Sequence, residues 1–202
     1  MPKPKIAASK ANAENVSTAK PKVGGAIYSA PLGTALPSNA KDELDAAFKG
    51  LGYVSEDGMT NANSMSSEDI KAWGGATVAT VQTEKEDRFT YMLIEATNVD
   101  VLKEVYGDDN VEGDLDAGIT IKANSQELKE HAIIVDMVLK GGILKRIVIP
   151  SGKVAEVGDI TYVDGEPIGY ETTVAAAPDE DENTHYEYIQ KPAVTPPSGG
   201  EG

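Results

Sequence analysis

The residues that could support chemistry in this chain are two histidines and several groups of acidic side chains. His131 begins an apolar stretch, and His185 lies in an acidic segment near the C-terminus. The chain has no cysteine, which removes thiolate nucleophiles, disulfides and cysteine metal sites together. General acid–base catalysis needs titratable groups that converge on one site, and no such spacing is present. We therefore interpret both histidines as structural or solvated, and we predict no enzymatic activity and no cofactor.

A carboxylate-rich run between residues 108 and 116 raises the possibility of a calcium loop. Its oxygen-bearing residues are Asp108, Asp109, Asn110, Glu112, Asp114 and Asp116. The glycine and the terminal bidentate glutamate of the EF-hand template are misplaced, so no metal site is predicted, although cation binding stays open. Gly74-Gly75 and Gly141-Gly142 are turn glycines. Neither pair has the Lys-Ser/Thr that a phosphate-binding loop requires.

Composition favours a β-rich body. Of the 202 residues, 40% are hydrophobic but only 5% are aromatic, so the core must be built mainly from Val, Ile, Leu and Ala. No run approaches the roughly 20 apolar residues of a membrane span, and the N-terminus lacks the pattern of a signal peptide. The sequence thus predicts a soluble protein made in a reducing cytoplasm. The net charge of −15 argues against tight binding of nucleic acid through phosphates.

The charge is distributed unevenly along the chain. Five lysines and one glutamate give residues 1–22 a charge of +4, which leaves −19 on the remainder. We interpret residues 1–23 as an extended basic arm that contacts a neighbouring subunit; the alternative is a solvated, disordered leader. The residues expected to make these contacts are Lys3, Lys5, Ile6, Lys10, Val16, Lys20 and Lys22.

The expected elements alternate between strands and two short helices. Leu44, Ala47, Phe48 and Leu51 have helical spacing, which predicts a helix over 40–49 capped by Ser38 or Asn39. Residues 55–69 are rich in Ser, Asn and Asp and indicate a long loop or a weak strand pair. Strands are expected at 77–82, 87–96, 119–123, 130–139, 143–149, 153–157, 160–163 and 168–175, with a helix at 99–106 closed by Gly107. Residues 176–202 are interpreted as an acidic, then Pro/Gly-rich tail.

Several short motifs, in order along the chain, resemble a known family. They are GGAIYSAPLGTALP from Gly24, LGYVSEDG from Leu51, KAWGG from Lys71, VYGDDN from Val105 and GDITYVDGEPIGYE from Gly158. Together they cover residues 24–175 and resemble the major tail tube proteins of long-tailed phages with non-contractile tails. The resemblance implies a β-sandwich or barrel flanked by an α-helix, which forms hexameric rings that stack into a tube.

The resemblance also implies partners and a location. It implies a virion protein whose tube conducts DNA without binding it tightly, and which contacts a tape-measure protein, a tail terminator and tail-tip proteins. Alternation along 87–96 sends Phe89, Tyr91 and Leu93 to the core, so we expect Glu84, Glu86 and Thr90, or else Asp136, to face the lumen. Trp73 is expected to be a core or interface residue. Two alternatives are an acidic β-sandwich adhesin that forms no rings and a small hydrolase that uses carboxylates.

Overall fold

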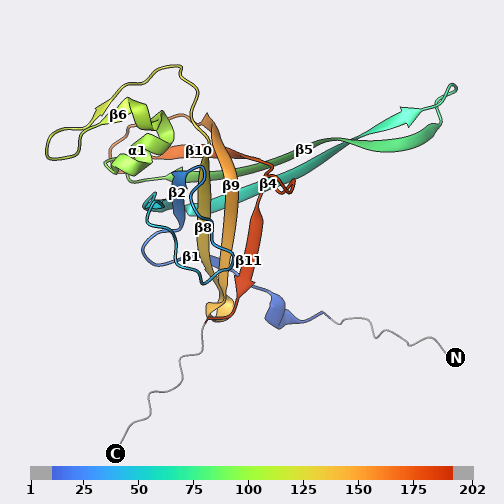
Figure 1. Ribbon diagram of the computed structural model, residues 1–202, viewed down its shortest axis with the longest axis horizontal. Coiled ribbons are helices and arrows are strands. Elements are labelled where there is room, and N and C mark those ends of the chain that lie inside the picture. Colours follow the sequence, from blue (N-terminus) through green and yellow to red (C-terminus); the bar gives the residue numbers. More distant parts are fainter. Residues whose placement is uncertain (1–10, 193–202) are drawn as a thin grey trace, which may run out of the picture.

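One large antiparallel sheet, with a single α-helix beside it, makes up the computed structural model over residues 11–192, the part of the chain that the structure describes (Figure 1). Its strands are β1 (Ala19–Pro21), β2 (Ile27–Pro31), β3 (Lys49–Gly50), β4 (Val54–Lys71), β5 (Thr77–Leu93), β8 (His131–Leu139), β9 (Leu144–Val157), β10 (Tyr170–Ala177) and β11 (Tyr186–Gln190). A separate short pair joins β6 (Val111–Glu112) to β7 (Thr120–Ile121). The prediction of a mainly β fold with one flanking helix is confirmed.

The large sheet is open rather than closed into a barrel. Its order is β3-β2-β8-β9-β10-β5-β4, while β1 also pairs with β8 and β11 also pairs with β9. Strand β4 therefore stands at one end of the sheet. Within the described residues, its outer edge has no partner strand.

The main core lies between one face of the sheet and the helix α1 (Val99–Tyr106). Phe89, Tyr91 and Leu93 are buried on this face of β5, as their alternation predicts. Helix α1 begins at Asn98, whose side chain accepts a hydrogen bond from the backbone N–H of Asp100. It ends at Gly107, whose φ of 94° suits glycine. The predicted helix at 99–106 is confirmed.

A buried ion pair joins the two central strands. Strands β8 and β9 are connected by the 3-10 turn Lys140–Gly142, and their register places Asp136 opposite Arg146. The Arg146 guanidinium donates from Nε to Asp136 Oδ1 at 2.6 Å and from Nη2 to Oδ2 at 2.8 Å. Both side chains are almost completely buried. The guanidinium also donates to the carbonyls of Asn39 and Asp42, at 3.1 and 2.8 Å.

The helix predicted over 40–49 is wrong, and contacts with Arg146 favour the path that replaces it. Residues 38–48 form bends, irregular backbone and one short turn instead of a helix. In this path the carbonyls of Asn39 and Asp42, which would accept hydrogen bonds within an α-helix, accept them from the buried Arg146 guanidinium. Of the four residues predicted to share one helix face, Leu44, Ala47 and Phe48 pack in a second small core with Ile134, whereas Leu51 is buried in the main core.

The longest hairpin replaces a predicted loop and two predicted strands. Residues 55–69 all belong to one strand, β4, so both alternatives for this segment, a long loop and a weak strand pair, are wrong. The expected strands at 77–82 and 87–96 form one continuous strand, β5. In the same way, residues 153–157 continue β9, whereas the expected strand at 160–163 is absent. Figure 1 shows β4 and β5 extending well beyond the body to a free tip.

The acidic segment after residue 176 is not wholly a tail. Strand β10 continues to Ala177, and β11 pairs antiparallel with β9 from Tyr186 opposite Val148 to Gln190 opposite Leu144. No packing period is evident in the sequence here because β11 is an edge strand: Tyr186 and Tyr188 are half-buried on one face, and the other face is exposed. Residues 186–190 therefore belong to the folded body.

We predict that breaking the buried ion pair destabilises the body far more than removing an exposed one. The variant Arg146→Ala leaves Asp136 charged and buried, so the free energy of unfolding should fall by about 3–5 kcal/mol in urea denaturation. The double variant Asp136→Leu/Arg146→Met should recover much of this loss. The control is Lys122→Ala, which removes the exposed Lys122–Glu112 pair. Equal effects of the two single variants would contradict the prediction.

Candidate assembly site

The outer part of the β4–β5 hairpin has no core of its own. Every residue from 60 to 85 is exposed. At about 3.3 Å per residue, Thr77–Lys85 alone extends roughly 30 Å. A two-stranded ribbon is only marginally stable in water, so one that projects this far gains stability from a surface that covers it.

Trp73 lies in the turn at the end of this ribbon. The turn is closed by hydrogen bonds between the backbones of Ala72 and Ala76 and of Gly75 and Ala72. The Trp73 side chain is fully exposed. The core alternative for Trp73 is therefore wrong, and only the interface alternative stays as a prediction.

Asp87 fixes the base of the ribbon to the C-terminal segment. Its carboxylate accepts hydrogen bonds from Asn61 Nδ2 at 2.7 Å, Thr184 Oγ1 at 2.6 Å and His185 Nδ1 at 2.5 Å. The His185 ring also meets Phe89 edge to face, with the ring centroids 5.3 Å apart. We call these four polar residues, Asn61, Asp87, Thr184 and His185, the Asp87 cluster. The cluster joins β4, β5 and the segment that leads into β11.

The electrostatics of the cluster favour the charged form of Asp87. Burial opposes the charge, but the hydrogen bonds from Thr184, Asn61 and His185, together with the charge of His185, outweigh it and lower the pKa of Asp87. His185 therefore has a structural role, one of the two roles expected from the sequence.

The residues expected to face the lumen lie in different environments. Glu84 and Glu86 are on the face of β5 opposite the core, with Glu86 in a half-exposed pair with Arg88 at 3.3 Å. Thr90 lies on the same face and bonds to Thr173 of β10 at 2.9 Å. Asp136 does not belong with them, because it is buried against Arg146 and cannot line an open channel.

The arm contacts are only partly within the described residues. Val16 and Lys20 are exposed, whereas Lys22 pairs with Asp136 at 3.3 Å. Strand β1 pairs with β8, so residues 19–22 lie against the same subunit's own body. Lys3, Lys5, Ile6 and Lys10 lie outside the described residues.

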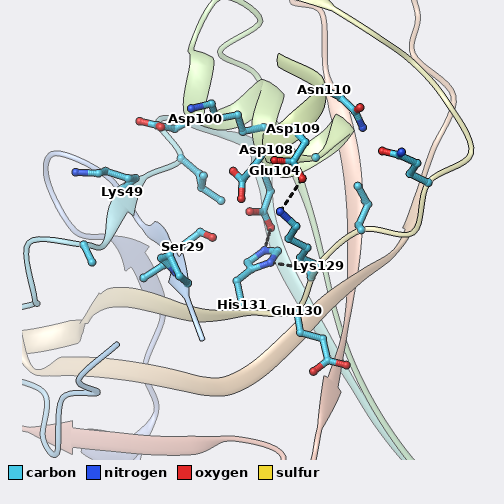
Figure 2. Close-up of a pocket in the computed structure, with 18 of the residues that line it drawn as sticks. Ser29, Lys49, Asp100, Glu104, Asp108, Asp109, Asn110, Lys129, Glu130 and His131 are labelled. Carbon is cyan, nitrogen blue, oxygen red and sulfur yellow. Dashed lines mark hydrogen bonds and ion pairs between the residues drawn. The ribbon is translucent and has the colours of Figure 1, made fainter. Parts of the chain in front are cut away.

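A second polar site surrounds His131, in a cavity of about 470 Å³ beneath α1 (Figure 2). His131 Nε2 lies 2.8 Å from Glu104 Oε1, and Nδ1 lies 3.0 Å from the carbonyl oxygen of Lys129. Both partners are acceptors, so an imidazolium that donates from both nitrogens satisfies them. Burial opposes this charge, but the Glu104 carboxylate outweighs it and raises the pKa of His131. The pair holds α1 on β8.

The acidic loop uses its carboxylates locally. Asp109 pairs with Lys129 at 2.7 Å, Glu112 pairs with Lys122 at 2.6 Å, and Asp114 accepts from the N–H groups of Asp116 and Ala117. Within residues 11–192, no three His, Asp or Glu side chains are grouped so that they could hold a metal ion. Over the same range, no helix is long and apolar enough to cross a bilayer.

Comparison with known proteins identifies the family. A family model described as phage tail tube protein matches residues 11–199, nearly the whole chain. The chain belongs to the phage tail tube proteins. No curated protein matches it significantly.

Membership assigns this tail tube subunit a structural role in the virion tail. Sequence reasoning missed the Asp87 cluster and the buried ion pair of this subunit. A signal existed for the ion pair, because Asp136 and Arg146 each interrupt an apolar strand at matching distances from the Lys140-Gly141-Gly142 turn. None existed for Asp87, since its partners Thr184 and His185 are almost 100 residues away.

We predict that the Asp87 cluster makes an acid-sensitive contribution to stability. Because the pKa of Asp87 is lowered in the folded state, this contribution is present above the ordinary carboxyl pKa and is lost as pH falls through the lowered value. The free energy of unfolding, measured by urea denaturation at a series of pH values, should therefore fall less steeply at acidic pH in Asp87→Asn than in the wild type. Asp164→Asn, at an exposed position, controls for the loss of one negative charge. If the free energy of unfolding fell equally with acidic pH in the wild type and in Asp87→Asn, a contribution from the Asp87 cluster would be ruled out.

Proposed function

We propose that this tail tube subunit assembles into hexameric rings that stack into a hollow tube, through which DNA passes during ejection into the host. The observation that carries the proposal is the uncovered ribbon of residues 60–85. In a ring or a stack, a neighbouring subunit covers the ribbon and so supplies the stability that it lacks alone.

The unpaired edge of β4 supports the same proposal. An exposed edge presents a row of free backbone donors and acceptors to any strand that approaches it. In our proposal, the β4 edge continues the sheet into the next subunit of the ring. Repetition of this head-to-tail contact closes a ring when the rotation between subunits permits it.

The polar face of the sheet is the proposed lumen wall. It carries Glu84, Glu86 and Thr90 on β5 and extends through Thr173 of β10 to Glu156 of β9. A wall of lysines would neutralise phosphates, release counterions and hold DNA in place, whereas an acidic or neutral wall lets it slide. Screening over about 8 Å at physiological salt confines the repulsion to close approach.

The remaining parts of the proposal rest on the uneven charge of the chain and on the family resemblance. The basic arm lies on the acidic body of an adjacent subunit and ties one ring to the next. A tape-measure protein contacts the inside of the growing tube, and terminator and tail-tip proteins contact its ends. The subunit is made in the bacterial host cytoplasm before it enters the virion.

We predict that the ribbon is required for assembly but not for folding. Replacement of residues 64–86 by Asn-Gly joins the paired residues Asn63 and Asp87 through a two-residue hairpin turn. The variant should keep a cooperative thermal transition, because the core lies outside the ribbon. In negative-stain electron microscopy, wild-type protein should form rings or tubes and the variant only isolated particles.

Isolated wild-type particles at every concentration, even with tail-tip complexes as nuclei, would contradict the tube proposal. That result would favour the acidic interaction module instead. Tubes formed by the ribbon-less variant would show that other surfaces drive assembly.

A further prediction concerns the arm, whose deletion must spare β1 and Lys22. Removal of residues 1–16 should leave the circular dichroism spectrum of the body unchanged, because β1 and its pairing with β8 are retained. Tubes should be shorter or absent, since the arm's lysines and apolar residues no longer bridge adjacent rings. Replacement of Lys3, Lys5 and Lys10 by Gln separates the role of charge from that of length. Full-length tubes from the deletion variant would show that the arm is dispensable.

A further inference from the structure

The ribbon ends in an apolar side chain that nothing within the described residues covers. Trp73 is fully exposed at the tip, and it is the sole tryptophan of the chain. Burial of an aromatic side chain removes about 150–250 Å² from water, and tryptophan is among the residues that most often dominate an interface. Its place at the end of a projecting ribbon favours insertion into another molecule.

The body carries a cavity of suitable size and character. It has a volume of about 420 Å³ and lies between β1, β2, β8 and the start of β4. Its apolar lining includes Ala26, Ile27, Val54, Met59, Val135 and Met137. Met59 and Met137 are only partly buried, and methionine adapts its shape and makes favourable sulfur contacts with aromatic rings.

Two polar features of this cavity match the hairpin tip. Glu56 and Asp57 line it as exposed acids beside one lysine, Lys20, so its charged lining is net negative, and Lys71 lies two residues before Trp73. Ser55 also lines the cavity, and its buried hydroxyl has no hydrogen-bond partner among the described residues. The indole N–H is a donor without an acceptor role, so a rotated Ser55 hydroxyl can accept from it.

The subunit cannot fill this cavity with its own Trp73. Residues 54–59 lie at the body end of β4, and the twelve residue steps from Met59 to Lys71 separate them from the tip by about 40 Å of extended strand. A projection that fits a cavity elsewhere on an identical molecule allows two arrangements. Two copies that exchange tips form a closed pair, whereas copies that each give a tip to one neighbour and receive one from another form rings or open filaments; the proposed tube requires the second arrangement.

We propose that Trp73 of one subunit docks into the cavity between β1, β2, β4 and β8 of a second copy, with Lys71 beside the partner copy's acidic rim. This inference rests on the proposed tube assembly and names the contact that directs it. The cavity beneath α1 is the less suitable receptor, because the Glu104–His131 pair and several further charged side chains line it.

The sole tryptophan gives a direct test. On assembly of the wild-type protein, Trp73 emission should shift to shorter wavelength and lose most of its quenching by iodide. Trp73→Ala should raise the critical concentration for assembly by about tenfold or more, as expected for a central interface residue, and Trp73→Phe by less. The thermal midpoint of the dilute subunit should not change, because Trp73 makes no contact within it.

Cross-linking identifies the receptor, because the chain contains no cysteine. The variant Ala72→Cys/Ala19→Cys places one thiol at the tip and one at the cavity, and oxidation should give a ladder of covalent oligomers. The matched control, Ala72→Cys/Ala47→Cys, places the second thiol at the cavity beneath α1 and should give no ladder. Tubes in which Trp73 stays as exposed as in the dilute subunit would overturn the docking while leaving the tube proposal intact.

A protein that forms no tubes would contradict the proposed function, and the cross-link would still decide the docking. A ladder from Ala72→Cys/Ala19→Cys in concentrated subunits would support it. The absence of a ladder there, or a ladder from the control alone, would overturn it.

Discussion

Strands β4 and β5 extend far beyond the apolar core of the body, and this excess length constrains the rest of the molecule. Their inner halves share the core through Phe89, Tyr91 and Leu93, and their outer halves are exposed on both faces. Strands that extend beyond their core leave exposed backbone groups and side chains that another molecule can cover. The body must therefore hold the ribbon at a fixed place and direction, so that identical copies can meet in the same way each time.

Two buried polar groups supply that rigidity. The Asp136–Arg146 pair connects the central strands to the loop at 39–42 and, through Lys22, to the N-terminal segment. Asp87 connects the base of the ribbon to the segment before β11. Each is costly to leave unpaired in the interior, so the contacts that satisfy it also fix the geometry around it. Both ends of the described chain are thereby tied to the sheet that carries the ribbon.

The acidic composition and the exposed apolar tip have opposite effects on association. A net charge of −15 keeps dilute subunits apart through mutual repulsion. In the proposed docking, Trp73 and the cavity between β1, β2, β4 and β8 provide local attraction that depends on orientation. On that proposal, a subunit with both properties stays dispersed until a correct head-to-tail contact forms.

The sequence by itself determined the elements whose signals are local. Alternation identified the buried face of β5, Gly107 marked the end of α1, and the glycine turn at 140–142 paired β8 with β9, while the ordered motifs identified the family. Only the tertiary structure decided the rest. Residues 38–48 have good local signals for a helix but take an irregular path in which two of their carbonyls bind Arg146, and residues 186–190 pair with β9 instead of forming a tail. Trp73 shows the same limit: a tryptophan beside Gly74-Gly75 has no local signal for exposure, because exposure depends on how far the ribbon reaches beyond the core.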